Sequence, residues 1–144
     1  MKIKFIIYFL ISTALFSACD DKYEVVTDFS KPIAPYIEFS AATTVAAKEG
    51  VNSNVAVRLK ESIQEPITVN YEITGAGAKT GSITIPRGAL TANIVVNFPV
   101  GTVPASATTA TSKITLKSAM AGNQSLTIGY AGTNQVSRNI TISK

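Results

Sequence analysis

The sequence predicts an all-β protein, an antiparallel β-sandwich of about seven to eight strands that follows an N-terminal signal peptide. Apolar residues alternate with polar ones through much of residues 35–144, and this is the pattern of half-buried strands. The alternating stretches recur at turn-bounded intervals of about 8 to 12 residues, as in antiparallel sandwiches. A short apolar run after two N-terminal lysines predicts the signal peptide.

The signal peptide is expected to cover residues 1–18. Lys2 and Lys4 form its positive start, the apolar run Phe5–Phe16 follows, and two small residues precede Cys19. The apolar run contains 12 residues, whereas a helix needs about 20 to cross the hydrocarbon core of a bilayer. The segment is therefore expected to be removed rather than to span a membrane.

Cys19 is the only cysteine of the chain, so it has no partner for an intramolecular disulfide. The stretch LFSAC at positions 15–19 resembles a bacterial lipobox, although the large residue nearest the expected leucine position is Phe16. The resemblance implies that Cys19 is acylated and begins the mature chain, and two or more acyl chains give stable membrane anchoring. The alternative is an ordinary signal peptide in which Cys19 is incidental.

Residues 19–34 are polar and lack sustained periodicity, so we interpret them as a flexible tether that holds the sandwich, residues 35–144, off the membrane. Asp20 and Asp21 follow the cysteine. This is similar to the acidic stretch of lipoproteins displayed on the outer face of the Gram-negative outer membrane. The expected location is therefore the outer membrane, lipid-anchored and exposed at the cell surface. Retention on the periplasmic face is the alternative.

The mature chain, residues 19–144, is long enough for one domain with its own core. Without Lys2 and Lys4 it carries nine acidic and eleven basic residues, a net charge of +2, so no strongly charged partner is indicated. The basic residues are scattered singly and form no patch with interleaved aromatic residues, so no nucleic-acid partner is expected. Every acidic residue lies at or before Glu72.

The individual strands follow from the period-two pattern. Val55, Val57 and Leu59, for example, face one way in a single stretch. Residues 41–47 are rich in alanine, but their β-branched residues favour an extended segment over a helix. The segment KESIQEP is expected to form a hairpin turn and GAGAKTG a flexible loop. The expected strands are 36–41, 53–60, 66–74, 82–86, 90–98, 112–118, 125–130 and 136–143.

The order of these elements resembles a Calx-beta domain. The motif KEG at Lys48–Gly50, the strands after it and the stretch SITIPRG at Ser82–Gly88 carry the resemblance, which covers residues 36–143. It implies an immunoglobulin-like sandwich, and in calcium-binding members of the family acidic loops hold the metal. Only Glu49 has a counterpart among those acidic residues, and residues 99–112 contain no carboxylate. Because calcium takes about 6 to 8 oxygen ligands, several of them charged, no metal site is predicted.

Catalysis is not expected, and neither is a cofactor. The chain has no histidine, the residue most often used for acid–base chemistry and as a zinc ligand, and Cys19 is assigned to the anchor. The stretch GAGAKTG does not fit a phosphate-binding loop, because a strand rather than a helix is expected after it. A hydrolytic carboxylate pair is conceivable only among Glu38, Glu49, Glu61, Glu65 and Glu72. Glu61 and Glu65 are expected to be solvated turn residues instead.

Tyr130 and Asn134 are the candidate ligand-binding residues. The chain has no tryptophan, so tyrosines are the remaining stacking platforms for a sugar, and Tyr71 lies on the buried phase of its strand. Tyr130 stands in IGYAGTNQ among glycines and amides, which suits a binding loop with hydrogen-bonding side chains. The alternative is a strand-end tyrosine that packs its ring over the core and wets its hydroxyl.

These observations predict a non-catalytic, lipid-anchored accessory module at the cell surface that binds a glycan or another envelope protein. The glycan version rests on analogy, since a fold does not define a function. The alternative is a structural or assembly subunit of an outer-membrane complex that associates through sheet edges. The Thr- and Ser-rich stretches ATTATSKIT and SRNITIS are the strands expected to form those edges.

Overall fold

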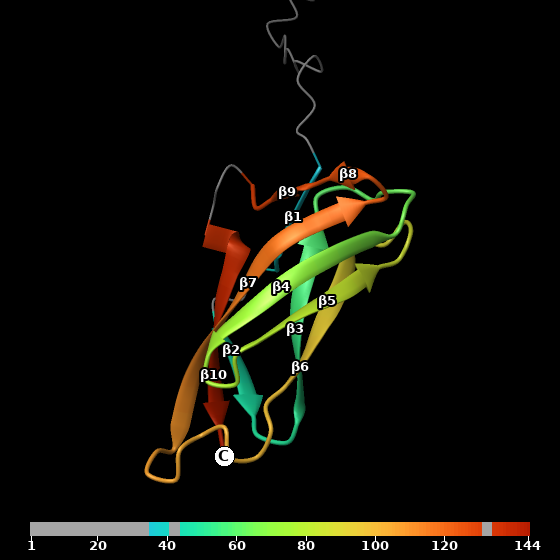
Figure 1. The fold of residues 1–144 in the computed structure, drawn as a ribbon. Coiled ribbons are helices and arrows are strands. Elements are labelled where there is room, and N and C mark those ends of the chain that lie inside the picture. The colour runs from blue at the N-terminus through green and yellow to red at the C-terminus, as the bar shows by residue number, and fades with distance from the viewer. Residues whose placement is uncertain (1–34, 41–43, 131–133) are drawn as a thin grey trace, which may run out of the picture. The chain divides into compact units, whose positions relative to one another are not determined.

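The computed structural model describes residues 35–40, 44–130 and 134–144. The chain divides into two compact units, Met1–Pro32 and Ile33–Lys144, and all described residues belong to the second. The predicted signal peptide, the tether up to residue 34 and Cys19 therefore lie outside the described residues. Figure 1 shows that the described residues form β-strands joined by loops, with one 3-10 helix, η2 (Asn134–Val136). No helix in these ranges is long and apolar enough to cross a membrane.

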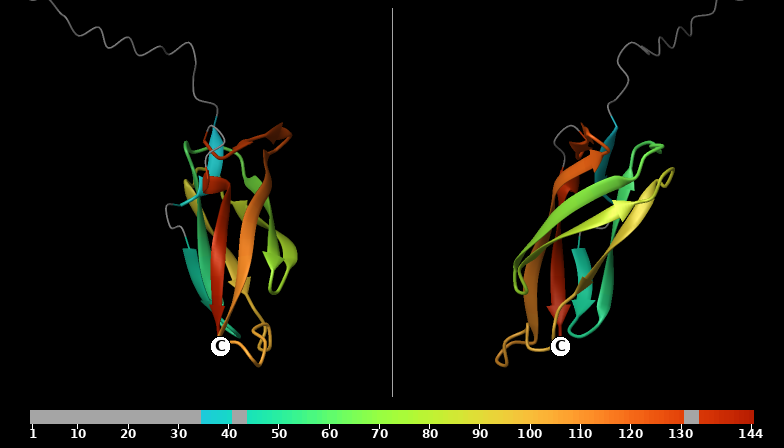
Figure 2. Two further views of the ribbon diagram at one scale, coloured as in Figure 1. Left: turned by 90° about the vertical axis from the view of Figure 1, so that its left-hand side faces the viewer. Right: turned by 45° about the vertical axis from the view of Figure 1, so that its right-hand side comes forward.

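Two sheets build the molecule, and the predicted all-β, immunoglobulin-like sandwich is confirmed (Figures 1 and 2). Neighbouring strands are antiparallel, except that β9 pairs with β1 and β2 pairs with β10 in parallel. The first sheet has the order β6 (Thr91–Asn97), β3 (Asn52–Leu59), β1 (Tyr36–Phe39), β9 (Thr127–Ile128). The second has the order β2 (Thr44–Lys48), β10 (Ser137–Ser143), β7 (Thr109–Ala121), β4 (Ile67–Gly75), β5 (Lys79–Ile85), with β8 (Gln124–Ser125) paired to β7.

The core lies between the sheets and is filled from alternate positions of the strands. The predicted inward residues Val55, Val57 and Leu59 are all buried, and Tyr71 is buried as expected. Leu90 is an exception, because it lies in the turn before β6 and is half exposed. Burial of apolar side chains on both inner faces is the main term that stabilises such a sandwich. The largest fully buried side chains are Phe39, Phe98, Ile37, Ile67, Ile73, Ile85, Ile94, Ile114, Ile140 and Ile142.

Residues 60–66 do not form the predicted hairpin turn. They connect β3, in the first sheet, with β4, in the second, so the segment crosses from one sheet to the other. The carbonyl of Ile63 accepts a hydrogen bond from Gly88 N at 2.8 Å, and the Ile63 side chain packs against the core. Periodicity marks where two strands lie in the sequence, but it does not say that they pair with each other.

The predicted strand 125–130 is divided between the two sheets. Its first part is β8, which pairs with β7, and its second part is β9, which pairs with β1. Leu126 stands between them, is buried in the core, and donates its backbone N–H to Ala119 O at 2.9 Å. The chain therefore changes sheet at Leu126, because that side chain is held inside the sandwich.

The two Thr- and Ser-rich stretches lie inside the second sheet and not at its edges. β10 has β2 and β7 as neighbours, and β7 has β10 and β4. The prediction that these strands offer free edges was therefore wrong. Hydrogen bonds to the neighbouring strands already pair most of their backbone. Their outward side chains form a polar face of the sheet. Among the described residues, the strands at the sheet margins are β6, β9, β2 and β5.

Arg138 joins the two sheets where the chain leaves β1. Its side chain points inward from β10 and is buried. The guanidinium donates to Phe39 O at 3.3 Å and to Ser40 O at 2.8 Å, and it lies 5.5 Å from the centroid of the Phe39 ring. Burial lowers the pKa of Arg138, and the nearby Glu38 carboxylate offsets part of that effect.

Candidate functional site

Tyr130 is half exposed and stacks beside a second tyrosine. Its ring centroid lies 5.3 Å from that of Tyr36, with an interplanar angle of 42°, a spacing typical of aromatic pairs. The N–H of Gly129 donates to Ile37 O at 2.7 Å, which ties the residue before Tyr130 to β1. With 46% of its surface accessible, Tyr130 offers a ring that a ligand can reach.

Asn134, the second predicted ligand residue, is the first residue of η2. Its side chain lies outside the described part of the structure, and so do residues 131–133 between it and Tyr130. The expectation that Asn134 binds a ligand together with Tyr130 therefore stays a prediction.

A polar groove of about 280 Å³ opens beside Tyr36 on the outer face of the first sheet. Tyr36 and Glu38 are outward residues of β1, and Arg58 and Lys60 lie opposite them on β3 and just after it. Glu38 faces Arg58 directly in the ladder, and Lys60 N donates to Tyr36 O at 3.1 Å. We call these four residues, together with Tyr130, the tyrosine groove.

The carboxylate of Glu38 forms one wall of the tyrosine groove and is almost completely buried. Its Oε1 accepts hydrogen bonds from Arg58 Nε at 2.8 Å and Nη2 at 2.6 Å. The Glu38 side chain is 4% exposed, whereas that of Arg58 is 49% exposed. Charge-assisted bonds of this kind hold an arginine in one orientation, so the outer side of the guanidinium is presented to solvent in a fixed position.

The tyrosine groove keeps a positive charge after this ion pair has formed. Lys60 is exposed, and its ammonium makes no hydrogen bond or ion pair within the described ranges. Glu61 follows on the exposed bend, and buried Arg138 lies near Glu38. The groove is therefore bordered by the ring of Tyr36, which Tyr130 contacts from outside its lining, and by the two cations Arg58 and Lys60.

Sequence reasoning named Tyr130 as a candidate, which stays a prediction, and did not group Glu38, Arg58 and Lys60 with it. Glu38 is flanked by the apolar residues Ile37 and Phe39, a pattern that favours an outward and solvated carboxylate on the strand. β1, the strand of Glu38, is contacted by η2 from a distant part of the chain. No local pattern in the sequence reports that contact.

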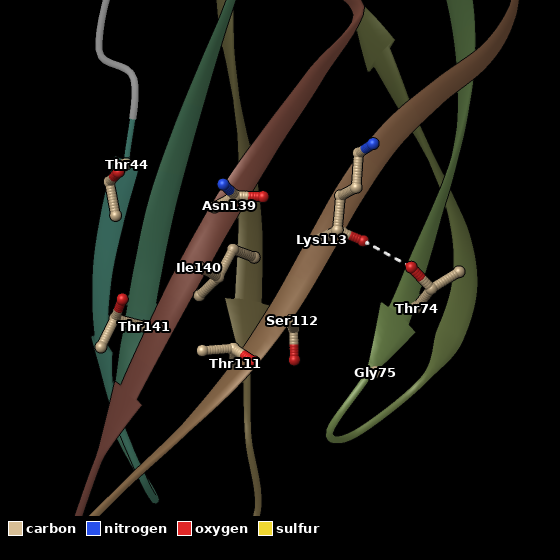
Figure 3. A pocket seen from close by; sticks show the side chains of 9 residues that line it. All are labelled: Thr44, Thr74, Gly75, Thr111, Ser112, Lys113, Asn139, Ile140 and Thr141. Carbon is tan, nitrogen blue, oxygen red and sulfur yellow. Dashed lines mark hydrogen bonds between the residues drawn. The ribbon is translucent and has the colours of Figure 1, made fainter.

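A second groove lies on the outer face of the second sheet and is shown in Figure 3. A row of side chains crosses four strands there: Thr44 pairs with Asn139, Asn139 with Lys113, and Lys113 with Thr74. Thr111 and Thr141, which pair with each other, add hydroxyls beside this row. The groove has a volume of about 480 Å³ and no aromatic or carboxylate side chain in its lining. We call it the threonine groove.

No family model matches the sequence, and no curated protein matches it. One solved structure of similar fold is the crystal structure of the apo form of the Calx CBD1 domain. The TM-score is 0.56 at 13% sequence identity, and the match covers 76% of this chain and 96% of that chain. The fold is Calx-beta-like. At this identity the similarity shows the architecture alone.

Glu49 is the residue of this Calx-beta-like sandwich that the sequence matched to an acidic loop residue of the calcium-binding family members. Its carboxylate accepts the backbone N–H of Val103, in the loop between β6 and β7. That loop begins at Pro99 and ends where β7 starts at Thr109, three residues earlier than predicted. In residues 35–40, 44–130 and 134–144, no group of three or more His, Cys, Asp or Glu side chains is placed to hold a metal ion.

Proposed function

We propose that this protein is a non-catalytic accessory module that binds a glycan in the tyrosine groove while acyl chains on Cys19 hold it at the cell surface. The exposed ring of Tyr130 beside Tyr36 carries the proposal. Aromatic rings supply apolar area for the face of a sugar, and polar groups beside them fix its orientation through hydrogen bonds. The tyrosine groove has both features, contributed by β1, β3 and the segment after β9.

The exposure of Tyr130 also argues against the alternative in which it caps the core. A tyrosine buried in the core costs about 3 kcal/mol or more when it is truncated to alanine. Tyr130 is 46% exposed, and its ring contacts that of Tyr36. Such a contact contributes about 0.5 to 1.5 kcal/mol beyond the area that it buries.

Tyr130→Ala tests the glycan proposal. Binding to a panel of surface polysaccharides is measured by calorimetry for the mature chain and the variant, together with thermal unfolding of both. The expected result is loss of most binding with a small loss of stability. Val100→Ala is the control, because Val100 is also exposed and apolar but lies in the loop after β6, in a pocket with Glu49 and Lys144. Binding by neither protein to any glycan, or equal binding by both, contradicts the proposal.

Cys19→Ala tests the anchor. Because acylation needs the thiol, the variant is expected to leave the membrane fraction and to behave as an exported protein without an anchor. Detergent partitioning and cell fractionation measure this, and protease treatment of intact cells distinguishes the outer face from the periplasmic face. A Cys19→Ala variant that stays in the membrane fraction would show that another feature anchors the chain.

Assembly through a sheet edge is a second candidate, and β6 supports it. In the described residues β6 pairs with β3 alone, and its seven residues carry no charge and no proline. Its pairing with β3 runs in unbroken register, and outward Val95 is 53% exposed. A regular, uncharged margin is the kind that accepts a strand from another chain, because charges and bulges are the usual protections.

Val95→Lys tests the edge candidate by placing a charge on β6. If β6 pairs with another chain, the substitution is expected to abolish the complex, as seen by light scattering after gel filtration or by pulldown from envelope extracts. Thr84→Lys on β5 is the matched control, because β5 is the margin of the other sheet and Thr84 is also exposed. Complexes that survive Val95→Lys, or none in the wild type, would remove this candidate.

A further inference from the structure

We propose that the tyrosine groove selects an acidic sugar, such as a uronic acid unit of a polysaccharide. Its carboxylate binds between Arg58 and Lys60 while its ring lies against Tyr130 and Tyr36. The inference rests on the proposed function, because it names the class of glycan for the same site. The orientation of Arg58, the charge of Lys60 and the size of the groove carry it.

Arg58 is positioned for a second carboxylate. Its Nε and Nη2 both donate to the same oxygen of buried Glu38, which fixes one edge of the guanidinium against the protein. A guanidinium has five N–H donors in a planar fork, so donors remain on the side away from Glu38. Half of the side chain is exposed, and a ligand carboxylate can therefore approach those donors without breaking the ion pair.

Lys60 adds the charge that makes the tyrosine groove attractive to an anion. Glu38 neutralises one cation, and the exposed ammonium of Lys60 supplies a second. Within the described ranges no carboxylate is paired with Lys60. The hydrogen bond from Lys60 N to Tyr36 O holds the start of its side chain directly beside the tyrosine. An anion that contacts Lys60 is therefore also next to the ring pair.

The dimensions fit one sugar unit. The groove volume is about 280 Å³, just below the range of about 300 to 1,000 Å³ that drug-sized ligands occupy. Tyr36 O on β1 accepts a hydrogen bond from Lys60 N. Glu38 on the same strand faces Arg58 on β3, so the tyrosine and both cations border the same groove. A polysaccharide can continue from that unit along the open outer face of the first sheet.

The experiment compares polygalacturonate with its methyl ester, two forms of one backbone that differ in charge. The mature chain carrying Cys19→Ala is titrated with each form in the presence of a chelator, because calcium cross-links the acidic form. The wild-type groove is expected to bind the acidic form at least about tenfold more tightly than the ester, because hydrogen bonds between charged groups are stronger than those between neutral groups. Raising the ionic strength is expected to reduce that preference.

Lys60→Gln is the main variant, because it removes one charge and leaves the Glu38–Arg58 pair intact. It is expected to weaken binding of the acidic form by about tenfold and to leave the ester unchanged. Lys113→Gln, in the threonine groove, removes the same charge from the other sheet and is expected to change neither. Arg58→Gln, checked for folding by circular dichroism, is expected to lose the acidic preference completely.

Several outcomes would overturn the acidic inference. Equal affinity for the acid and the ester, or equal losses for Lys60→Gln and Lys113→Gln, would show that the groove does not select a carboxylate. If a neutral glycan binds in a Tyr130-dependent way and neither form of polygalacturonate binds, the proposed function stands and the acidic inference fails. If no glycan binds, both fail.

Discussion

The two ends of the sandwich each contain one carboxylate that accepts hydrogen bonds, and they use it differently. At the tyrosine end, where β1 begins and β9 lies, Glu38 accepts from the side chain of Arg58. At the loop end, near the C-terminus, Glu49 accepts from the backbone N–H of Val103. One carboxylate therefore orients a cation, and the other fixes a loop.

This difference determines what each end presents to solvent. At the loop end the Val103 side chain is buried, the Lys144 ammonium donates to Ala105 O at 3.0 Å, and Val100 is 82% exposed. The polar groups there serve the loop itself and leave an apolar surface. At the tyrosine end, Glu38 is buried and the outer side of Arg58 stays available. The Glu49 carboxylate thus stabilises a loop at the loop end, whereas the Glu38 carboxylate orients a cation in the tyrosine groove.

Arg138→Met is expected to cause the largest loss, because it tests what holds the tyrosine end together. The substitution leaves the carbonyls of Phe39 and Ser40 without their donor and removes the cation over the Phe39 ring. Truncating a buried, hydrogen-bonded charge typically costs about 3 kcal/mol or more. Urea unfolding followed by circular dichroism measures the free energy of unfolding.

Arg87→Met serves as the control for Arg138→Met, because Arg87 is exposed in the turn between β5 and β6. It is expected to change the free energy of unfolding by less than about 0.5 kcal/mol, as surface substitutions usually do. If the two variants lose the same amount, Arg138 does not join the sheets in the way described.

Glu49→Ala is expected to have a smaller effect, confined to the loop end. It leaves the Val103 N–H without an acceptor, and an unsatisfied buried donor costs about 1 to 3 kcal/mol. Limited proteolysis should then cut within residues 99–107 faster than in the wild type. Glu49→Gln keeps a carbonyl acceptor and is expected to restore most of the protection. Equal cleavage of all three proteins would show that Glu49 does not fix the loop.

Calcium is expected to have the smallest effect, because among the described residues Glu49 is the only acidic side chain at the loop end and its carboxylate already accepts the Val103 N–H. A ligand at a hundredfold excess over its Kd stabilises the native state by about 2.7 kcal/mol, so an occupied site would be visible in a melting curve. Thermal unfolding in millimolar calcium and in chelator should coincide. A rise of the melting temperature by several degrees would indicate a metal site that the resemblance to Calx-beta domains implies.

The alternation of apolar residues predicted most of the fold. It placed Val55, Val57 and Leu59 on the buried side of β3 and Tyr71 in the core, where the structure has them. It could not predict pairing, because a strand that continues in its own sheet and one that crosses to the other have the same period. The crossings at residues 60–66 and at Leu126 were missed for that reason.

The candidate site was predicted only in part for a related reason. The glycines and amides around Tyr130 predicted a binding loop, which stays a prediction, and Tyr130 is half exposed. The cations beside it come from β3, and β1 brings Glu38 to Arg58 across a separation of 20 residues. A ladder between strands creates this arrangement, and no single stretch of the sequence contains it.

The most direct test of the difference between the two ends is to map where a bound glycan lies. Backbone amide shifts of the ¹⁵N-labelled mature chain are followed by NMR during titration with the tightest-binding polysaccharide fragment. The tyrosine groove predicts that the largest changes occur at Tyr36, Arg58, Lys60 and Tyr130, while Val51 and Val100 at the loop end do not move. Changes concentrated at the loop end, or in the threonine groove around Lys113 and Asn139, would contradict the assignment of the ligand site.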